Sequence, residues 1–182
     1  ISAFVQPLFN ELFGNPSSIH QEGREAKILL EKAREHVAAM IHAQHDEVVF
    51  TSCGTESANH ALKGIAYSKS SRGNHIITTR IEHPCVLNTC QYLQTKGFDV
   101  TFLPVDRHGL IEPDDVKKAI KSNTILISIM YANNETGNLL PIEEIGRIAR
   151  ECGIVFHSDM VQALGKIEIN MESLPIDIAT FS

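Results

Sequence analysis

The sequence lacks several patterns that would place it in familiar functional classes. Its four cysteines include no C-x-x-C pair, so neither a zinc ribbon nor a thioredoxin-type redox site is indicated. In a domain that looks intracellular, the four cysteines are most simply read as reduced thiols. His42 and His45 are spaced like a metal pair, but no third ligand is placed near them, and we expect no metal site.

Positive charge is also scarce, and no long apolar run is present. Lys and Arg total 16 against 22 Asp and Glu, for a net charge of −6. Because nucleic-acid-binding surfaces are basic, we expect neither a nucleic-acid partner nor an anionic membrane surface. No stretch approaches the roughly 18 apolar residues that a membrane span needs, and no signal peptide is visible. We therefore expect a cytoplasmic protein.

The length of 182 residues suits one domain with a sizeable core. The chain begins at Ile1 rather than methionine and stops at Ser182 within a strand-like pattern. We therefore expect a single domain over residues 1–182 that is truncated at both ends.

Hydrophobic spacing alternates along the chain between the periods of a helix and a strand. Helices are predicted over 3–13, 22–43, 55–70, 84–96, 112–121 and 142–152. Strands are predicted over 47–51, 75–79, 98–104, 125–131, 154–157 and 176–181. Strands joined by helical crossovers are typical of an α/β fold, here a mostly parallel, doubly wound sheet with helices on both faces.

Polar residues follow several of these strands, at the edge where open α/β sheets bind ligands. The small-residue turn T-S-C-G-T-E-S carries Gly54 and Thr55 into a helix, where a phosphate could sit on the free N–H groups. An ordinary helix N-cap would explain the same residues. The turn is neither G-x-G-x-x-G nor a Walker loop, so no nucleotide-binding fingerprint is indicated.

The other strand ends carry an imidazole, amides and a carboxylate. His83 could stack on a flat ligand or transfer protons near neutral pH, or it could simply cap the next helix. Asn134 lies in a segment that also reads as a tight turn. Asp159 could hold a protonated ring nitrogen or cap a helix, and Gln162 adds an amide three residues later.

Each of these residues has an ordinary structural explanation when it is taken alone. Together they supply a phosphate cradle, a ring stacker, amide donors and a carboxylate for a pyridine nitrogen at successive strand ends. That combination of groups indicates pyridoxal 5′-phosphate (PLP) as the cofactor.

The same segments resemble the class V aminotransferase family, specifically its NifS-like cysteine desulfurases and selenocysteine lyases. The matching strings are GNPSSIHQEGR, FTSCGTESAN, EHPCV, YANNETGNLLPIEEI and HSDMVQALGK. The resemblance implies the large domain of a fold-type-I, aspartate-aminotransferase-like enzyme that acts as a homodimer. It also implies conversion of L-cysteine to L-alanine, with the sulfur left on an enzyme cysteine for an acceptor protein, and leaves open whether the sulfur serves iron–sulfur cluster assembly, tRNA thiolation or another pathway.

For the cofactor phosphate, the resemblance implies contacts from Gly54, Thr55 and Ser182. Cys53 stands in this loop where the family usually has Gly or Ala. The lysine that forms the cofactor's Schiff base would come three residues after Ser182. We therefore expect residues 1–182 alone to be inactive.

For the cofactor ring, the resemblance implies that His83 stacks on one face and assists proton transfer. Asp159 would pair with the pyridinium nitrogen, Gln162 would bond the phenolic oxygen, and Asn134 would lie beside cofactor and substrate. Met160 is a departure, because the family usually has a small residue after the aspartate. Since Met160 or the next residue should lie near the ring, we expect a bulky thioether there to crowd the cofactor.

Other functions remain open from the sequence. The same scaffold could act as a selenocysteine lyase, a cysteine sulfinate desulfinase or another class V aminotransferase. A non-catalytic, dimerising remnant is a second alternative, and a nicotinamide oxidoreductase is a distant third. None of the cysteines at positions 53, 85, 90 and 152 stands where the family's nucleophilic cysteine belongs.

Overall fold

The computed structural model describes residues 2–182, which group into two compact units. The first unit extends to Val49 and the second spans Phe50–Ser182, and each is described by itself. The predicted single domain over 1–182 stays a prediction. No helix in the described part of the chain is long and apolar enough to cross a membrane.

The first unit is helical. Its elements are α1 (Ser2–Asn10), α2 (Gln21–Ile41) and the short 3-10 helix η1 (His45–Glu47). The start of α2 is capped by His20, whose ring Nδ1 accepts the N–H of Gly23 at 3.2 Å. The helix ends at His42, which adopts a left-handed conformation with φ 52°. The short segment predicted over 3–13 and the long helix predicted over 22–43 are both helical, within three residues of the predicted ends.

The strand predicted over 47–51 is wrong. The N–H of Val48 closes a turn onto the carbonyl of His45 at 3.3 Å, and the Val48 carbonyl accepts a hydrogen bond from the Arg34 guanidinium. Those backbone groups are therefore used locally, and no described strand pairs with this segment. The β-branched and aromatic composition favours a strand only where a neighbouring strand is available to pair with it.

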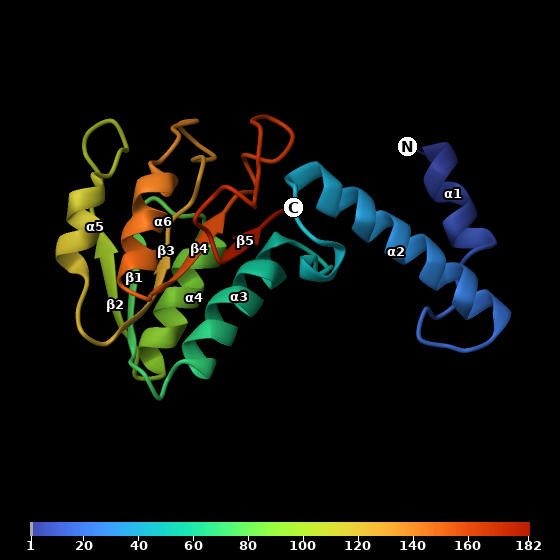
Figure 1. The fold of residues 1–182 in the computed structure, drawn as a ribbon, viewed down its shortest axis with the longest axis horizontal. Helices are drawn as coiled ribbons and strands as arrows, with labels where there is room; N and C mark the ends of the chain where they lie inside the picture. The colour runs from blue at the N-terminus through green and yellow to red at the C-terminus, as the bar shows by residue number, and fades with distance from the viewer. Residues whose placement is uncertain (1) are drawn as a thin grey trace. The chain divides into compact units, whose positions relative to one another are not determined.

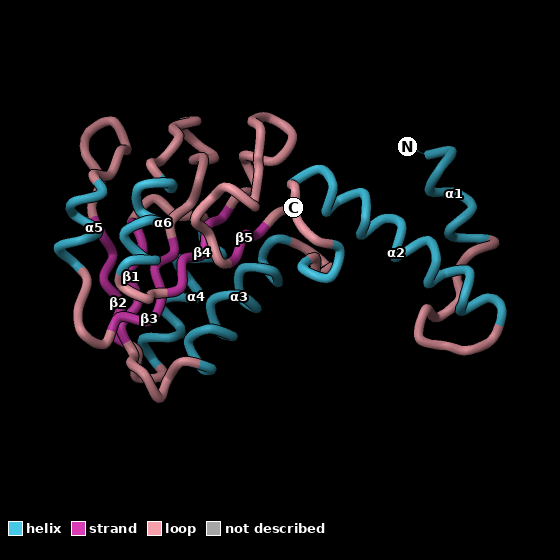
Figure 2. The backbone as a smooth tube through the Cα atoms, viewed as in Figure 1, coloured by secondary structure: helices cyan, strands magenta, loops and turns pink. Residues whose placement is uncertain are grey.

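The second unit is a five-stranded sheet with helices on both faces (Figures 1 and 2). Its strands are β1 (His75–Thr79), β2 (Asp99–Leu103), β3 (Thr124–Ser128), β4 (Val155–Asp159) and β5 (Ile178–Thr180). Its helices are α3 (Gly54–Ser68), α4 (Pro84–Thr95), α5 (Pro113–Ala119) and α6 (Ile142–Glu151). All four strand pairings are parallel. The predicted doubly wound α/β architecture is confirmed, with five strands instead of six.

Helices α3 and α4 pack on each other and cover one face of the sheet, while α5 and α6 cover the other (Figure 1). Every residue of β1 and β3 is buried, which explains why apolar and β-branched residues make up most of both strands. One core cluster joins α3 and α4 to β1, β2 and β3, with Leu62, Ile76, Leu93 and Leu126 fully buried.

The strand order is β2-β1-β3-β4-β5. The chain moves from β1 outward to β2 and then returns to the other side of β1 to form β3. Sheets with this order bind ligands outside the carboxyl ends of the strands, at the point where the direction reverses. The fold therefore places the ends of β1, β3 and β4 where a ligand would be expected.

Candidate functional site

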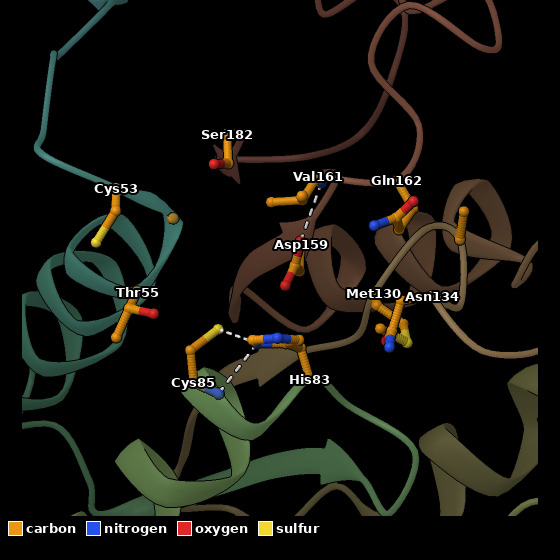
Figure 3. A pocket seen from close by; sticks show the side chains of 12 residues that line it. Cys53, Thr55, His83, Cys85, Met130, Asn134, Asp159, Val161, Gln162 and Ser182 are labelled. Atoms are coloured by element: carbon orange, nitrogen blue, oxygen red, sulfur yellow. Dashed lines mark hydrogen bonds between the residues drawn. The ribbon is translucent and has the colours of Figure 1, made fainter.

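A pocket of about 240 Å³ lies in the second unit at the carboxyl ends of the strands (Figure 3). All the residues predicted to hold the cofactor line it: Gly54, Thr55, His83, Asn134, Asp159, Gln162 and Ser182. The remaining lining residues are Cys53, Cys85, Met130, Ala132 and Val161. The fold therefore brings together every predicted site residue, although they are spread over almost 130 positions of sequence.

One wall of the pocket is the N-terminus of α3, which begins at Gly54. A Cβ atom added to Gly54 would lie 3.2 Å from the Cβ of Ser182 and 3.5 Å from a methyl group of Val161. The absence of a side chain thus allows the helix end to approach Ser182 closely. The first-turn N–H groups and the Thr55 and Ser182 hydroxyls form a concave set of donors that suits a phosphate.

Cys53 occupies the N-cap position of α3 and is exposed. Its thiol pKa is lowered, first by the backbone N–H of Glu56 and then by the Ser52 hydroxyl. The N-terminal end of the helix dipole is positive, so it stabilises a thiolate at this position as it would stabilise a bound phosphate.

His83 is the N-cap residue of α4, which begins with Pro84. Its ring Nδ1 accepts the backbone N–H of Cys85 at 3.2 Å and lies 3.0 Å from the Cys85 Sγ. Because Nδ1 accepts an N–H, the proton of the neutral ring is assigned to Nε2. Burial raises the pKa of the Cys85 thiol to about 11, so the thiol is protonated and can donate to Nδ1.

Asp159 is the last residue of β4 and is only 5% exposed. Its Oδ1 accepts the N–H of Val161 at 3.0 Å. Burial raises the pKa of the Asp159 carboxyl, while the Val161 N–H and the nearby His83 act in the opposite direction. A buried carboxylate of this kind is stabilised by a cationic partner, and a protonated ring nitrogen in the pocket would supply one.

The residue that faces the pocket beside Asp159 is Val161, whose side chain is drawn in Figure 3. Met160 is fully buried and is not one of the lining residues. Its N–H bonds the carbonyl of Thr180 at 2.9 Å, which fixes the backbone at the end of β4. The expectation that a thioether at position 160 crowds the ring is wrong, because the chain turns that side chain into the core.

The loop after β3 is organised by Asn133 rather than by Asn134. The Asn133 Oδ1 accepts the backbone N–H groups of Glu135 and Thr136, each at 2.9 Å, and its Nδ2 donates to the carbonyl of Ile81 at 3.0 Å. Asn134 is exposed and lines the pocket, with its Nδ2 donating to Glu135 at 2.8 Å. The buried Asn133 side chain thus fixes the loop conformation, and the Asn134 side chain lies at the pocket.

Gln162 lies one turn beyond Asp159, and its Oε1 accepts a hydrogen bond from the Lys166 ammonium. With that oxygen engaged, the amide N–H groups are available on the pocket side (Figure 3). They can donate to an oxygen on the ligand ring. Lys166 itself is not among the lining residues.

Sequence reasoning missed Cys85, Met130 and Ala132 as pocket residues. Cys85 had a usable signal, because it lies in the first turn of a helix that begins beside His83. Nothing in the sequence distinguished Met130 and Ala132, since they continue an apolar run whose residues are all expected in the core. Among the described residues, no group of three or more His, Cys, Asp or Glu side chains is placed to hold a metal ion.

The donors in the pocket fit a phosphorylated pyridine such as PLP. A helix N-terminus with two hydroxyls suits the phosphate, and a buried carboxylate suits the ring nitrogen. An exposed imidazole and an amide remain for the ring face and a ring oxygen. No residue in the set conflicts with that ligand.

Comparison with known proteins agrees with the geometry. Residues 2–182 match the family described as aminotransferase class-V. The chain is 51% identical to the cysteine desulfurase IscS of Dictyoglomus turgidum and 50% identical to that of Methanosarcina thermophila. These alignments cover 98% and 97% of the chain. They cover 45% and 44% of the relatives, so the chain spans less than half of their length.

Two solved structures are also similar. One, described as SspA in complex with cysteine, has a TM-score of 0.94 and 42% identity over 97% of this chain and 51% of its own. The other, described as a NifS-like protein, has a TM-score of 0.93 and 43% identity over 97% of this chain and 49% of its own.

Proposed function

This chain belongs to the class-V aminotransferase family of enzymes, and we propose that the protein is a PLP-dependent cysteine desulfurase. The observation that carries the proposal is the convergence of Gly54, His83 and Asp159, from three separate elements, on one pocket. The reaction is supported by the relatives that are 51% and 50% identical to this chain, because both are named cysteine desulfurases. The similar structure described as a complex with cysteine supports the substrate.

We propose that residues 1–182 are the cofactor-binding large domain. In this domain the N-terminus of α3, with Thr55 and Ser182, binds the phosphate. Asp159 holds a proton on the ring nitrogen, and Gln162 donates to the phenolic oxygen. When bound, PLP supplies the electron-withdrawing ring that makes bonds at the substrate Cα labile.

His83 is the proposed stacking and proton-transfer residue. Its Nδ1 is held by Cys85, so the Nε2–H is the group that can be presented to the pocket. An imidazole has one nitrogen that can donate a proton and one that can accept it, which suits it to move a proton to or from a substrate atom. Asn134, in the loop after β3, is proposed to lie beside the cofactor and substrate.

A PLP titration tests the cofactor assignment. We expect the protein to bind PLP stoichiometrically, with a shift in the absorbance spectrum of the ring as it moves from water into the pocket. Gly54→Val should abolish binding, because the larger side chain would fill the space beside Ser182. Gly64→Val is the matched control, because Gly64 is an exposed residue of the same helix and a Cβ there would meet only His60, at 4.0 Å. Equal PLP binding by the wild type and Gly54→Val would contradict the proposal.

Substrate comparison tests the reaction. We expect the full-length protein to release alanine from cysteine faster than from selenocysteine or cysteine sulfinate. A preference for selenocysteine or the sulfinate would move the protein to another branch of the family, and no turnover of any of the three would favour a non-catalytic domain. Residues 1–182 alone should bind PLP without becoming covalently attached on borohydride reduction, because the lysine expected to attach it comes after Ser182.

The proposed assembly is a homodimer in the cytoplasm that passes sulfur to an acceptor protein. Support for a partner surface comes from the first unit, where Phe9, Phe13 and Ile19 are 76%, 75% and 90% exposed. All three lie within residues 9–19, and large apolar side chains left exposed are typical of protein interfaces where they form a contiguous patch. Light scattering on the full-length protein measures the mass, and a monomer would contradict the dimer.

A further inference from the structure

Glu82 is a buried carboxyl group that the proposed function does not use. It lies between β1 and α4, immediately before His83, and is 3% exposed. Its Oε1 accepts the Thr79 hydroxyl at 2.8 Å and the backbone N–H of Met130 at 3.0 Å. Its Oε2 is buried and has no hydrogen-bond partner among residues 2–182.

The two donors to Glu82 come from different strands. Thr79 ends β1, and Met130 follows β3 and lines the pocket. The single oxygen therefore ties together the ends of two neighbouring strands at the point where the sheet reverses direction. His83 continues from the first of these ends, and the loop that carries Asn134 continues from the second.

Burial and the missing donor at Oε2 favour the neutral form of this carboxyl group and outweigh the two donors at Oε1, which favour the ionised form. An ionised carboxylate spreads its charge over both oxygens, and here one oxygen would be buried without a donor, which is costly. Asp159, at the end of β4, acts on Glu82 as a like charge. The titratable neighbours on α4 are the Cys85 and Cys90 thiols, whose pKa values burial raises to about 11 and about 12, so both are neutral.

We propose that Glu82 is a positioning residue that works as a neutral carboxylic acid, tying the ends of β1 and β3 behind the pocket and leaving the negative charge to Asp159. The proposal rests on the proposed function only where it assigns Asp159 to the ring nitrogen. Burial, the main cause, raises the pKa of Glu82 to about 8, which agrees with the geometry and sets the range for a test.

The first test needs no cofactor. Glu82→Gln keeps an oxygen for Thr79 and Met130 but cannot ionise. An unfolded chain ionises Glu above about pH 4.5, whereas native Glu82 keeps its proton until about pH 8, so raising the pH between these values favours unfolding of the wild type only. From about pH 6.5 to pH 8, the folding constant of the wild type relative to Glu82→Gln should fall about 15-fold. Parallel profiles for the two proteins, measured by urea unfolding, would overturn the proposal.

The second test concerns positioning. In PLP titrations near pH 6.5, Glu82→Gln should bind within about twofold of the wild type, while Glu82→Ala, which removes the tie between the strands, should bind at least about tenfold more weakly. A Glu82→Gln protein that binds as poorly as Glu82→Ala would show that the charge is required and overturn the proposal. If Glu82→Ala does not fold, the comparison of wild type with Glu82→Gln still decides. Failure of all proteins to bind PLP would contradict the proposed function, while the unfolding profiles would still test Glu82.

Discussion

The backbone N–H of Cys85 donates to Nδ1 of His83 at 3.2 Å, and the Sγ of the same residue lies 3.0 Å from that nitrogen. One residue therefore contacts the imidazole twice. The backbone contact fixes which nitrogen carries the proton, and the thiol adds a second donor that holds the ring plane. The side chain that faces the pocket is thus oriented by the first turn of its own helix.

Removing the thiol should loosen this ring without changing its tautomer. We expect Cys85→Ala to weaken PLP binding about threefold, which corresponds to one weak hydrogen bond, and to broaden the imidazole resonances of His83 in NMR spectra. Cys85→Ser should bind PLP like the wild type, because the hydroxyl also donates to Nδ1. If Cys85→Ala and Cys85→Ser behave alike, the thiol contributes only packing.

Asp159→Asn should affect stability and cofactor binding in opposite directions. The amide keeps an oxygen for the Val161 N–H but removes a charge that burial disfavours. We expect the free energy of unfolding without cofactor to rise by up to about 1 kcal/mol, and PLP affinity to fall at least about tenfold because the ring nitrogen loses its anionic partner.

A control for this substitution is available just before β5. Asp177 also accepts a backbone N–H through its side chain, from Phe156 at 2.8 Å, but it does not line the pocket. Asp177→Asn should leave PLP affinity unchanged. A parallel loss of affinity in both variants, measured by fluorescence titration, would mean that Asp159 acts through general stability.

Two helical glycines should respond oppositely to alanine. At Gly146, in α6, a Cβ would lie 2.3 Å from the Pro175 carbonyl oxygen and 3.0 Å from the Phe156 ring. Because backbone and a buried ring must move, Gly146→Ala should cost at least about 2 kcal/mol of unfolding free energy. Gly64, in α3, is exposed and meets only His60 at 4.0 Å. Gly64→Ala should therefore add about 0.5 to 1 kcal/mol, and chemical denaturation measures both changes.

The sheet and its helices were predictable from the sequence because strands that are buried on both faces consist mainly of apolar residues. β1 has the predicted bounds of 75–79, and β4 begins one residue late and extends to Asp159. The failure at 47–51 has the opposite cause: composition describes what a strand prefers, but pairing depends on a neighbour that composition does not reveal.

The site was predictable as a set of positions but not as a set of contacts. Asp159 and His83 were predicted at the site because both follow predicted strands, and parallel strands end at a common edge of the sheet. Which of Met160 and Val161 faces the pocket depended on how the chain turns after β4. The roles of Asn133 and Glu82 likewise depend on distant partners, at Ile81 and Met130, that no local pattern indicates.

A buried histidine should make the protein sensitive to acid. His157, on β4, is fully buried, with its Nδ1 2.8 Å from the Ser128 hydroxyl and its Nε2 without a partner among the described residues. Burial lowers the pKa of His157 from 6.5 to about 3. Below about pH 6.5 the unfolded chain therefore binds a proton that the native protein does not, and stability falls as the pH drops toward about 3.

The contribution of His157 can be isolated with His157→Asn, which keeps an atom near the position of Nδ1 but does not titrate. Relative to this variant, the wild type should lose up to about 1.4 kcal/mol of unfolding free energy per pH unit below about pH 6. Glu82 opposes this trend above about pH 4.5, but it is present in both proteins and cancels in the difference. Urea unfolding at a series of pH values measures the slope, and equal slopes would show that His157 is protonated in the native protein.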